Sequence, residues 1–112
     1  MLKLFRIVAV ASFAMLISIV GSLYALVRLR HPDSVSVVAN MFGSLHKLVG
    51  IKLITRNKAT FNQPAIYIGN HQNNYDMVTI AAMVPPRTVS MGKRSLICIP
   101  FFGLVYWATG NI

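Results

Sequence analysis

With 112 residues, of which 55% are hydrophobic and only 12% are charged, the chain has room for one small domain, and its composition excludes a disordered or well-solvated protein in favour of membrane contact. Eleven Lys and Arg face two acidic residues, Asp33 and Asp76, and this net charge of +9 suits ligands that carry anionic phosphate. The basic residues form no dense arm or recognition helix, which excludes nucleic acid as the expected partner.

The first predicted element is an apolar helix over residues 7–27, a run without a charged side chain. A helix of this span, rising about 1.5 Å per residue, is about 31 Å long and matches the hydrocarbon core of a bilayer. A cleaved signal peptide is the alternative, but its apolar core is only about 7 to 15 residues long. We therefore expect residues 1–30 to be a retained hydrophobic membrane anchor.

The orientation of this anchor stays open. Two basic residues precede the apolar run and two follow it, namely Lys3, Arg6, Arg28 and Arg30. The positive-inside rule therefore finds no asymmetry between the two ends. A helix that spans the bilayer and a segment that dips into one leaflet and returns fit the pattern equally well.

Residues 31–50 are predicted to form an amphipathic helix that begins after Pro32, near Asp33 or Ser34, and ends at Gly50. Its apolar positions recur at helical spacing: Val38, Met41, Phe42, Leu45, Leu48 and Val49. Two roles fit such a helix. It covers the core of its own domain, or it lies at the membrane interface beside the anchor.

Residues 51–112 are predicted to alternate strands with a helix. The expected segments are strands over 51–55, 65–68 and 87–91, a polar turn over 56–64 and a helix over 77–83. A strand, a helix and a strand in this order imply a crossover and a parallel pair. The predicted fold class is therefore α/β: N-terminal membrane-associated helices, then the first part of a partly parallel sheet with covering helices. Because nothing completes this sheet, we expect the chain to be part of a longer protein.

His71 and Asp76 are the candidate catalytic pair. They follow the second predicted strand, and open α/β sheets bind ligands at the carboxyl ends of their strands. Histidine can accept a proton near neutral pH, and a carboxylate on its other ring nitrogen fixes the tautomer. No Ser or Cys adjoins the pair, so the base would activate a hydroxyl of the substrate. The spacing alone leaves an alternative open, a loop histidine followed by an aspartate that caps the next helix.

Two other kinds of site are disfavoured. Cys98 has no partner for an internal disulfide and lies in an apolar run, so we expect a buried, inert thiol. The three histidines, His31, His46 and His71, are too dispersed to gather round a metal ion, and no metal is expected.

The run from Asn70 to Asp76, Asn-His-Gln-Asn-Asn-Tyr-Asp, resembles the Asn-His-x-x-x-x-Asp signature of the glycerolipid acyltransferase family. Further blocks resemble the bacterial 1-acyl-glycerol-3-phosphate acyltransferases in the same order: residues 65–79, 92–96, 99–103 and 106–111. The resemblance covers essentially the whole chain. It identifies residues 51–112 as the N-terminal part of an acyltransferase domain.

The resemblance implies that His71 deprotonates the sn-2 hydroxyl of lysophosphatidate while Asp76 orients it. The hydroxyl oxygen then attacks the thioester of acyl-carrier protein or acyl-CoA, which gives phosphatidate for phospholipid biosynthesis. Four further residues are expected to bind substrate: Asn70, Lys93, Arg94 and Ser95. Lys93 or Arg94 would stabilise the thioester oxyanion or bind phosphate, with ordinary membrane-surface charge as the alternative. No cofactor is expected besides the acyl donor.

The resemblance also implies a place in the cell, the inner membrane with the active site facing the cytoplasm. The family's Glu-Gly-Thr-Arg block, which binds the substrate phosphate, is absent because the chain has no Glu. We therefore expect activity from the longer parent and none from these 112 residues alone. Two alternatives remain: an acyltransferase acting on another lysolipid or on glycerol-3-phosphate, and a non-catalytic module that anchors a partner on anionic lipid.

Overall fold

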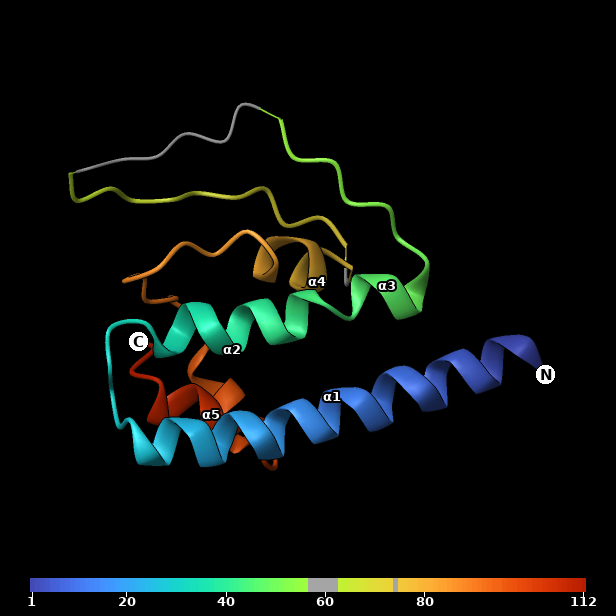
Figure 1. The fold of residues 1–112 in the computed structure, drawn as a ribbon, viewed down its shortest axis with the longest axis horizontal. Helices are drawn as coiled ribbons and strands as arrows, with labels where there is room; N and C mark the ends of the chain where they lie inside the picture. The colour runs from blue at the N-terminus through green and yellow to red at the C-terminus, as the bar shows by residue number, and fades with distance from the viewer. Residues whose placement is uncertain (57–62, 74) are drawn as a thin grey trace.

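The computed structural model describes residues 1–56, 63–73 and 75–112 of the chain. Within these ranges the helical segments are α1 (Leu2–Val27), α2 (Ser34–Gly43), α3 (His46–Val49), α4 (Asp76–Ala81), the 3₁₀-helix η1 (Arg94–Cys98) and α5 (Phe102–Ala108). In Figure 1, α2 lies above the C-terminal half of α1 and α4 lies above α2. The N-terminal half of α1 extends to the right beyond most of the molecule.

α1 confirms the helix predicted over residues 7–27 and begins earlier, at Leu2. It is the one described helix that is long and apolar enough to cross a membrane, with a mean hydropathy of 2.2 in its most apolar window. Only 11% of that window is buried inside the protein. A core helix of a soluble domain would be mostly covered, so this exposure favours a lipid environment for α1.

The C-terminal half of α1 is lined by small side chains where other helices approach. Its buried residues are Ile17, Ser18, Gly21, Ser22 and Ala25. A Cβ atom placed on Gly21 would be 3.1 Å from the side chain of Val105 in α5 and 3.3 Å from that of Val38 in α2. Small residues let helices pack closely, so this stripe brings α2 and α5 against α1.

The amphipathic helix predicted over 31–50 is divided in the structure into α2 and α3. Asp33 occupies the N-cap position of α2, but its side chain makes no capping hydrogen bond. Gly50 ends α3 with a φ of 77°, in the left-handed region that favours glycine at a helix end, as the sequence predicts. α2 packs against both α1 and α4, so it covers part of the protein's own core.

α2 and α4 meet at Gly43, where a side chain has no room. A Cβ atom at this position would collide with Cα of Ala82 and lie 2.5 Å from its backbone nitrogen. We expect Gly43→Ala to lower the free energy of unfolding by about 1–3 kcal/mol, because the two helices must separate. Denaturant unfolding in detergent, followed by circular dichroism, measures the loss. Gly69→Ala is the matched control, since the nearest atom to its new Cβ would be 3.6 Å away in Ile80. Equal stability of the two variants would contradict this contact.

The strands predicted over 51–55, 65–68 and 87–91 are not formed in the described residues, so the predicted sheet is not confirmed. Figure 1 draws residues 51–55 and 65–68 as extended chain without strand arrows, and Arg87 lies in a turn with a φ of 58°. The turn predicted over 56–64 lies mostly outside the described residues, including Asn57 and Asn62. The predicted helix over 77–83 is confirmed as α4, which runs from Asp76 to Ala81.

One pair of backbone hydrogen bonds does have the pattern of parallel strands. The amide of Ile112 donates to the carbonyl oxygen of Ser90 at 3.0 Å, and the amide of Gly92 donates to the carbonyl oxygen of Ile112 at 2.9 Å. The two bonds flank Met91, as they do in a parallel ladder. The buried hydroxyl of Tyr106 donates to the Ile112 carbonyl oxygen at 3.0 Å and supports this pairing from α5. Burial also raises the pKa of Tyr106, so the hydroxyl keeps its proton.

η1 and α5 were not predicted, because this apolar stretch lacks a polar face that would set a helical period. η1 and α5 pack closely at Gly103, where a Cβ atom would collide with the carbonyl oxygen of Ile97. The prediction of a buried Cys98 is wrong: the thiol is exposed at the end of η1. α5 packs against this short 3₁₀-helix, of which Cys98 is the last residue.

Candidate active site

The structure brings His71 and Asp76 together. His71 belongs to the loop that follows the extended segment 63–70, and Asp76 is the first residue of α4. Nδ1 of the imidazole lies 3.4 Å from Oδ2 of the carboxylate. The His71 side chain is 59% exposed and that of Asp76 is 25% exposed, so the imidazole remains open to a substrate while the carboxylate lies beneath it.

The loop's own backbone holds the carboxylate in place. The amides of Gln72 and Asn73 each donate to Oδ2 of Asp76 at 2.6 Å. These amides precede α4, so Asp76 does not cap that helix, and the capping alternative is not what the structure shows. Tyr75 occupies the N-cap position of α4. The side-chain oxygen of Asn73 accepts a hydrogen bond from the Tyr75 amide at 3.2 Å, which closes a turn inside the loop.

Gln72 and Asn73 are the site residues that the sequence analysis missed. Their contribution is made by backbone amides, which every residue except proline possesses, so no side-chain pattern reveals it. The one available signal was the composition of the loop, because asparagine favours turns that direct successive amides to one side.

These hydrogen bonds keep Asp76 ionised. The amide of Asn73 lowers the pKa of the carboxyl most, followed by the amide of Gln72, and the nearby His71 lowers the pKa further. Their combined effect exceeds the rise caused by desolvation and takes the pKa below the ordinary value of 3.8. Asp76 is therefore negatively charged throughout the neutral pH range, where it attracts an imidazolium.

The arrangement fits a general base that acts on a bound hydroxyl. With Nδ1–H directed toward Asp76, the lone pair of His71 is on Nε2, which has no hydrogen-bond partner among the described residues. A proton taken at Nε2 would leave an imidazolium that the carboxylate stabilises. No hydrogen bond joins a described Ser, Thr or Cys side chain to His71, and its exposed ring is open to a hydroxyl supplied by a substrate.

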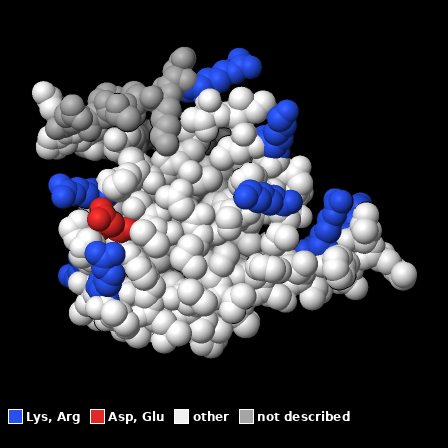
Figure 2. Space-filling view, viewed as in Figure 1, with Lys and Arg blue, Asp and Glu red and all other residues white. Residues whose placement is uncertain are grey.

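The other predicted site residues form no polar contact with this pair in the described structure. Asn70, Lys93, Arg94 and Ser95 are all exposed, and no hydrogen bond or ion pair among the described residues joins them to His71 or Asp76. Lys93 is the N-cap residue of η1, which follows it. Basic side chains are dispersed over the face shown in Figure 2 and are not gathered in one patch.

Comparisons with known proteins agree on one enzyme class. The family model described as Acyltransferase matches residues 34–112. The chain is 55% identical, over its whole length and 48% of the relative, to a 1-acyl-sn-glycerol-3-phosphate acyltransferase of Haemophilus influenzae. It is 46% identical, over its whole length and 46% of the relative, to the protein of that name in Escherichia coli.

A more distant relative is the human 1-acyl-sn-glycerol-3-phosphate acyltransferase alpha, with 30% identity over 77% of this chain and 31% of the relative. No solved structure matches the chain. The chain spans about half the length of the bacterial relatives.

Proposed function

We infer the function from one premise: this chain belongs to the acyltransferase family, whose model matches most of its length. In the protein that contains it, the chain transfers a fatty acyl group from acyl-carrier protein or acyl-CoA to the sn-2 hydroxyl of 1-acyl-glycerol-3-phosphate. The product is phosphatidate. The observation that carries this proposal is the 3.4 Å approach of His71 and Asp76, in a chain similar over its full length to enzymes named for this acceptor.

The proposed reaction is a direct transfer. Nε2 of His71 takes the proton of the substrate hydroxyl as the oxygen attacks the thioester carbonyl carbon. A carbon–oxygen bond forms and the carbon–sulfur bond breaks. The departing thiolate takes the proton back from the imidazolium, so no proton or electron pair is left over. Asp76 holds the ring in one tautomer and stabilises its positive charge in between.

Lys93 and Arg94 are proposed to bind the substrate phosphate, with Asn70 and Ser95 completing the substrate-binding set. The double variant Lys93→Ala, Arg94→Ala should raise KM for lysophosphatidate about tenfold or more, because a charge-assisted hydrogen bond contributes about 1.5–3 kcal/mol. Lys52→Ala, Arg56→Ala removes two exposed basic residues elsewhere and is the control. A fall in kcat at unchanged KM would instead assign the pair to the thioester oxyanion, and equal kcat and equal KM for both double variants would contradict a substrate role.

The test of the proposed function is an acceptor and donor panel with the purified full-length protein. Lysophosphatidate should be acylated in preference to glycerol-3-phosphate and to lysolipids with other headgroups. Acyl-carrier protein and acyl-CoA thioesters are supplied separately, which identifies the donor. Preference for another acceptor would replace lysophosphatidate as substrate, and absence of any transfer would leave only a membrane-anchoring module.

The proposed setting is the inner membrane. Residues 1–30 form the anchor, residues 31–50 the interfacial segment and residues 51–112 the first part of the acyltransferase domain. The exposed apolar surface of α1 supports insertion. The active site faces the cytoplasm, where acyl-carrier protein and CoA thioesters are made. The pairing that flanks Met91 supports a parallel sheet in the complete domain.

A further inference from the structure

α5 runs beside the last turns of α1 and in the same direction. Near its start, the hydroxyl of Ser22 in α1 donates to the carbonyl oxygen of Phe101 at 3.4 Å. Near its end, the amide of Arg30 donates to the carbonyl oxygen of Ala108 at 3.0 Å. These two contacts fix the level of α5 along α1. Phe101 lies level with Ser22, inside the apolar run, and Ala108 lies level with Arg30, beyond its end.

The side of α5 that faces away from α1 is apolar and exposed. Val105 and Ala108 are almost completely buried against the rest of the protein, whereas Phe101, Leu104 and Trp107 are 51%, 45% and 48% exposed. Leu104 and Trp107, three residues apart, lie on the same side of α5, and Phe101 immediately precedes the helix. Although the chain carries +9, residues 95–112 contain no charged side chain. Such a surface is expensive to expose to water.

This surface continues the lipid-compatible surface of α1. The last turn of α1 exposes Leu23, Leu26 and Val27, and the first basic residues follow immediately, with Arg28. Arginine at the end of an apolar helix marks the level of the lipid headgroups, and tryptophan concentrates at that level. Trp107 precedes Ala108 and therefore lies near this boundary. Phe101 is level with Ser22, five residues before Val27, and at 1.5 Å per residue it lies about 7–8 Å deeper in the apolar region.

We propose that Phe101, Leu104 and Trp107 form a membrane-contact surface, with which α5 enters the bilayer leaflet beside the end of α1. Phe101 lies among the acyl chains and Trp107 lies at the headgroup boundary. Lipid is the occupant because the surface adjoins the membrane helix at matching depth and carries no charge. The proposal rests on the proposed insertion of α1 and is independent of acyl transfer.

Trp107 is the only tryptophan of the chain and serves as its own reporter. The full-length protein, with any tryptophan outside this chain replaced by phenylalanine, is reconstituted into vesicles of phosphatidylcholine and phosphatidylglycerol that carry brominated lipid. Bromine near the headgroup end of the acyl chains should quench Trp107 more than bromine near their methyl end. In the variant Phe101→Trp, Trp107→Phe, this preference should shift toward the deeper bromine.

A third reporter separates the two parts of the proposal. The variant Phe13→Trp, Trp107→Phe places the tryptophan on the exposed side of α1 and reports insertion of that helix alone. Quenching at position 13 without quenching at 101 and 107 overturns the membrane role of α5. Sensitivity of Trp107 to aqueous iodide would then mean an open surface, and insensitivity would mean cover by a second copy or by another part of the protein. Absence of quenching at position 13 would mean that α1 is not inserted, and the proposal for α5 would fail with it. The acylation assay would still decide the proposed function.

A substitution within the surface provides an independent check. Leu104→Gln should reduce the quenching of Trp107 by brominated lipid, because a polar side chain beside it weakens burial in the leaflet. Ile54→Gln is the matched control, an exposed apolar residue outside α5. Equal loss in both variants, or none in either, would contradict a specific lipid contact of α5.

Discussion

Replacing His71 with alanine in the full-length protein should lower the rate of lysophosphatidate acylation by about 10²–10⁴-fold, the usual contribution of a positioned general base. The substrate hydroxyl then has no group to take its proton as it attacks the thioester. Membrane association should be unchanged, because His71 is a largely exposed side chain whose one described polar contact is Asp76. The measurement is phosphatidate formation at saturating donor, with vesicle flotation as the test of membrane binding.

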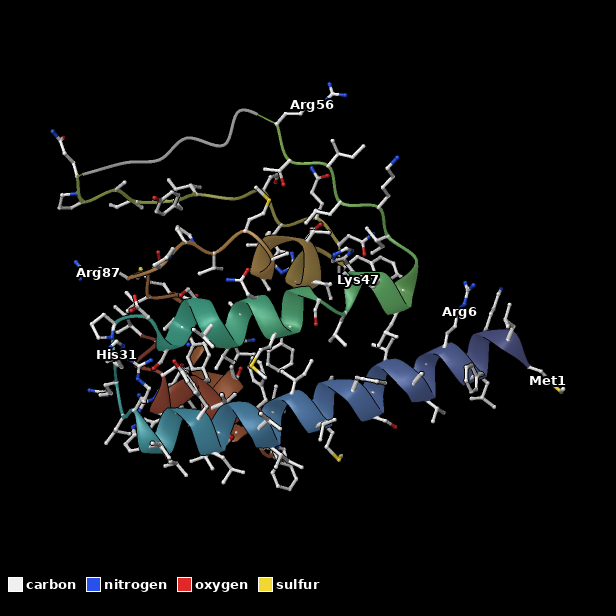
Figure 3. All side chains as sticks on the ribbon, viewed as in Figure 1. Met1, Arg6, His31, Lys47, Arg56 and Arg87 are labelled. Carbon is white, nitrogen blue, oxygen red and sulfur yellow. The ribbon has the colours of Figure 1, made fainter. Side chains whose placement is uncertain are left out.

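The chain offers a matched control for this variant. Nδ1 of His31 lies 3.9 Å from Oδ2 of Asp33, which makes a second histidine–aspartate pair, with a more exposed carboxylate than that of Asp76. Figure 3 shows His31 near the C-terminal end of α1, away from α4. His31→Ala should leave the acylation rate near that of the unaltered protein. A similar loss in both variants would mean that the effect at position 71 is structural and not catalytic.

Replacing Asp76 with asparagine should lower kcat by about 10²-fold or more, with little change in KM for lysophosphatidate. The amide keeps an oxygen that accepts from the amides of Gln72 and Asn73, so the loop retains its main acceptor. It loses the negative charge that stabilises the His71 imidazolium. Steady-state kinetics over a range of lysophosphatidate concentrations separates this outcome from a binding defect, in which KM alone would rise.

The same variant has an expected pH signature. The pKa of Asp76 lies below 3.8 in the folded protein, so its ionised form stabilises the fold at neutral pH. This stabilisation is complete above the ordinary pKa and is lost as the pH falls through the lowered folded value. The difference in unfolding free energy between the unaltered protein and Asp76→Asn should therefore shrink as the pH is lowered past 3.8. A difference that stays constant in acid would show that the hydrogen bonds of Gln72 and Asn73 do not favour the charged form.

The sequence predicted those parts of the fold that local pattern determines. The uncharged run over 7–27 is long enough to require a helix whatever its neighbours, and α1 is that helix. Periodicity placed apolar residues from 38 to 49 on one helix. It could not show the break after Gly43, where the chain turns from α2 toward α3 and the backbone of α4 approaches closely.

Other parts depend on partners that the local sequence does not specify. Three segments with strand composition form no strand in the described residues, and a strand needs a neighbour for its backbone hydrogen bonds. The exception is Met91, which has Ile112 beside it. α5 was missed because its two sides are both apolar, one against α1 and one exposed, so no polar face marks its period.

The candidate site was also predicted only in part. The sequence identified His71 and Asp76, because their residue types and spacing carry the chemistry, and the structure places them in contact. It did not identify the two amides that fix the carboxylate, since the backbone direction in a loop depends on its conformation. The roles of Asn70, Lys93, Arg94 and Ser95 stay predictions, because no hydrogen bond or ion pair among the described residues joins these exposed side chains to His71 or Asp76.

The central claim is that His71 activates the acceptor's own hydroxyl, so that the acyl group passes directly between substrates. Incubation of the full-length protein with radiolabelled acyl donor, first without and then with lysophosphatidate, tests it. The account predicts no label bound covalently to the protein before the acceptor is added, and labelled phosphatidate as soon as it is present. A labelled protein that forms without acceptor and then transfers its acyl group to lysophosphatidate would contradict it.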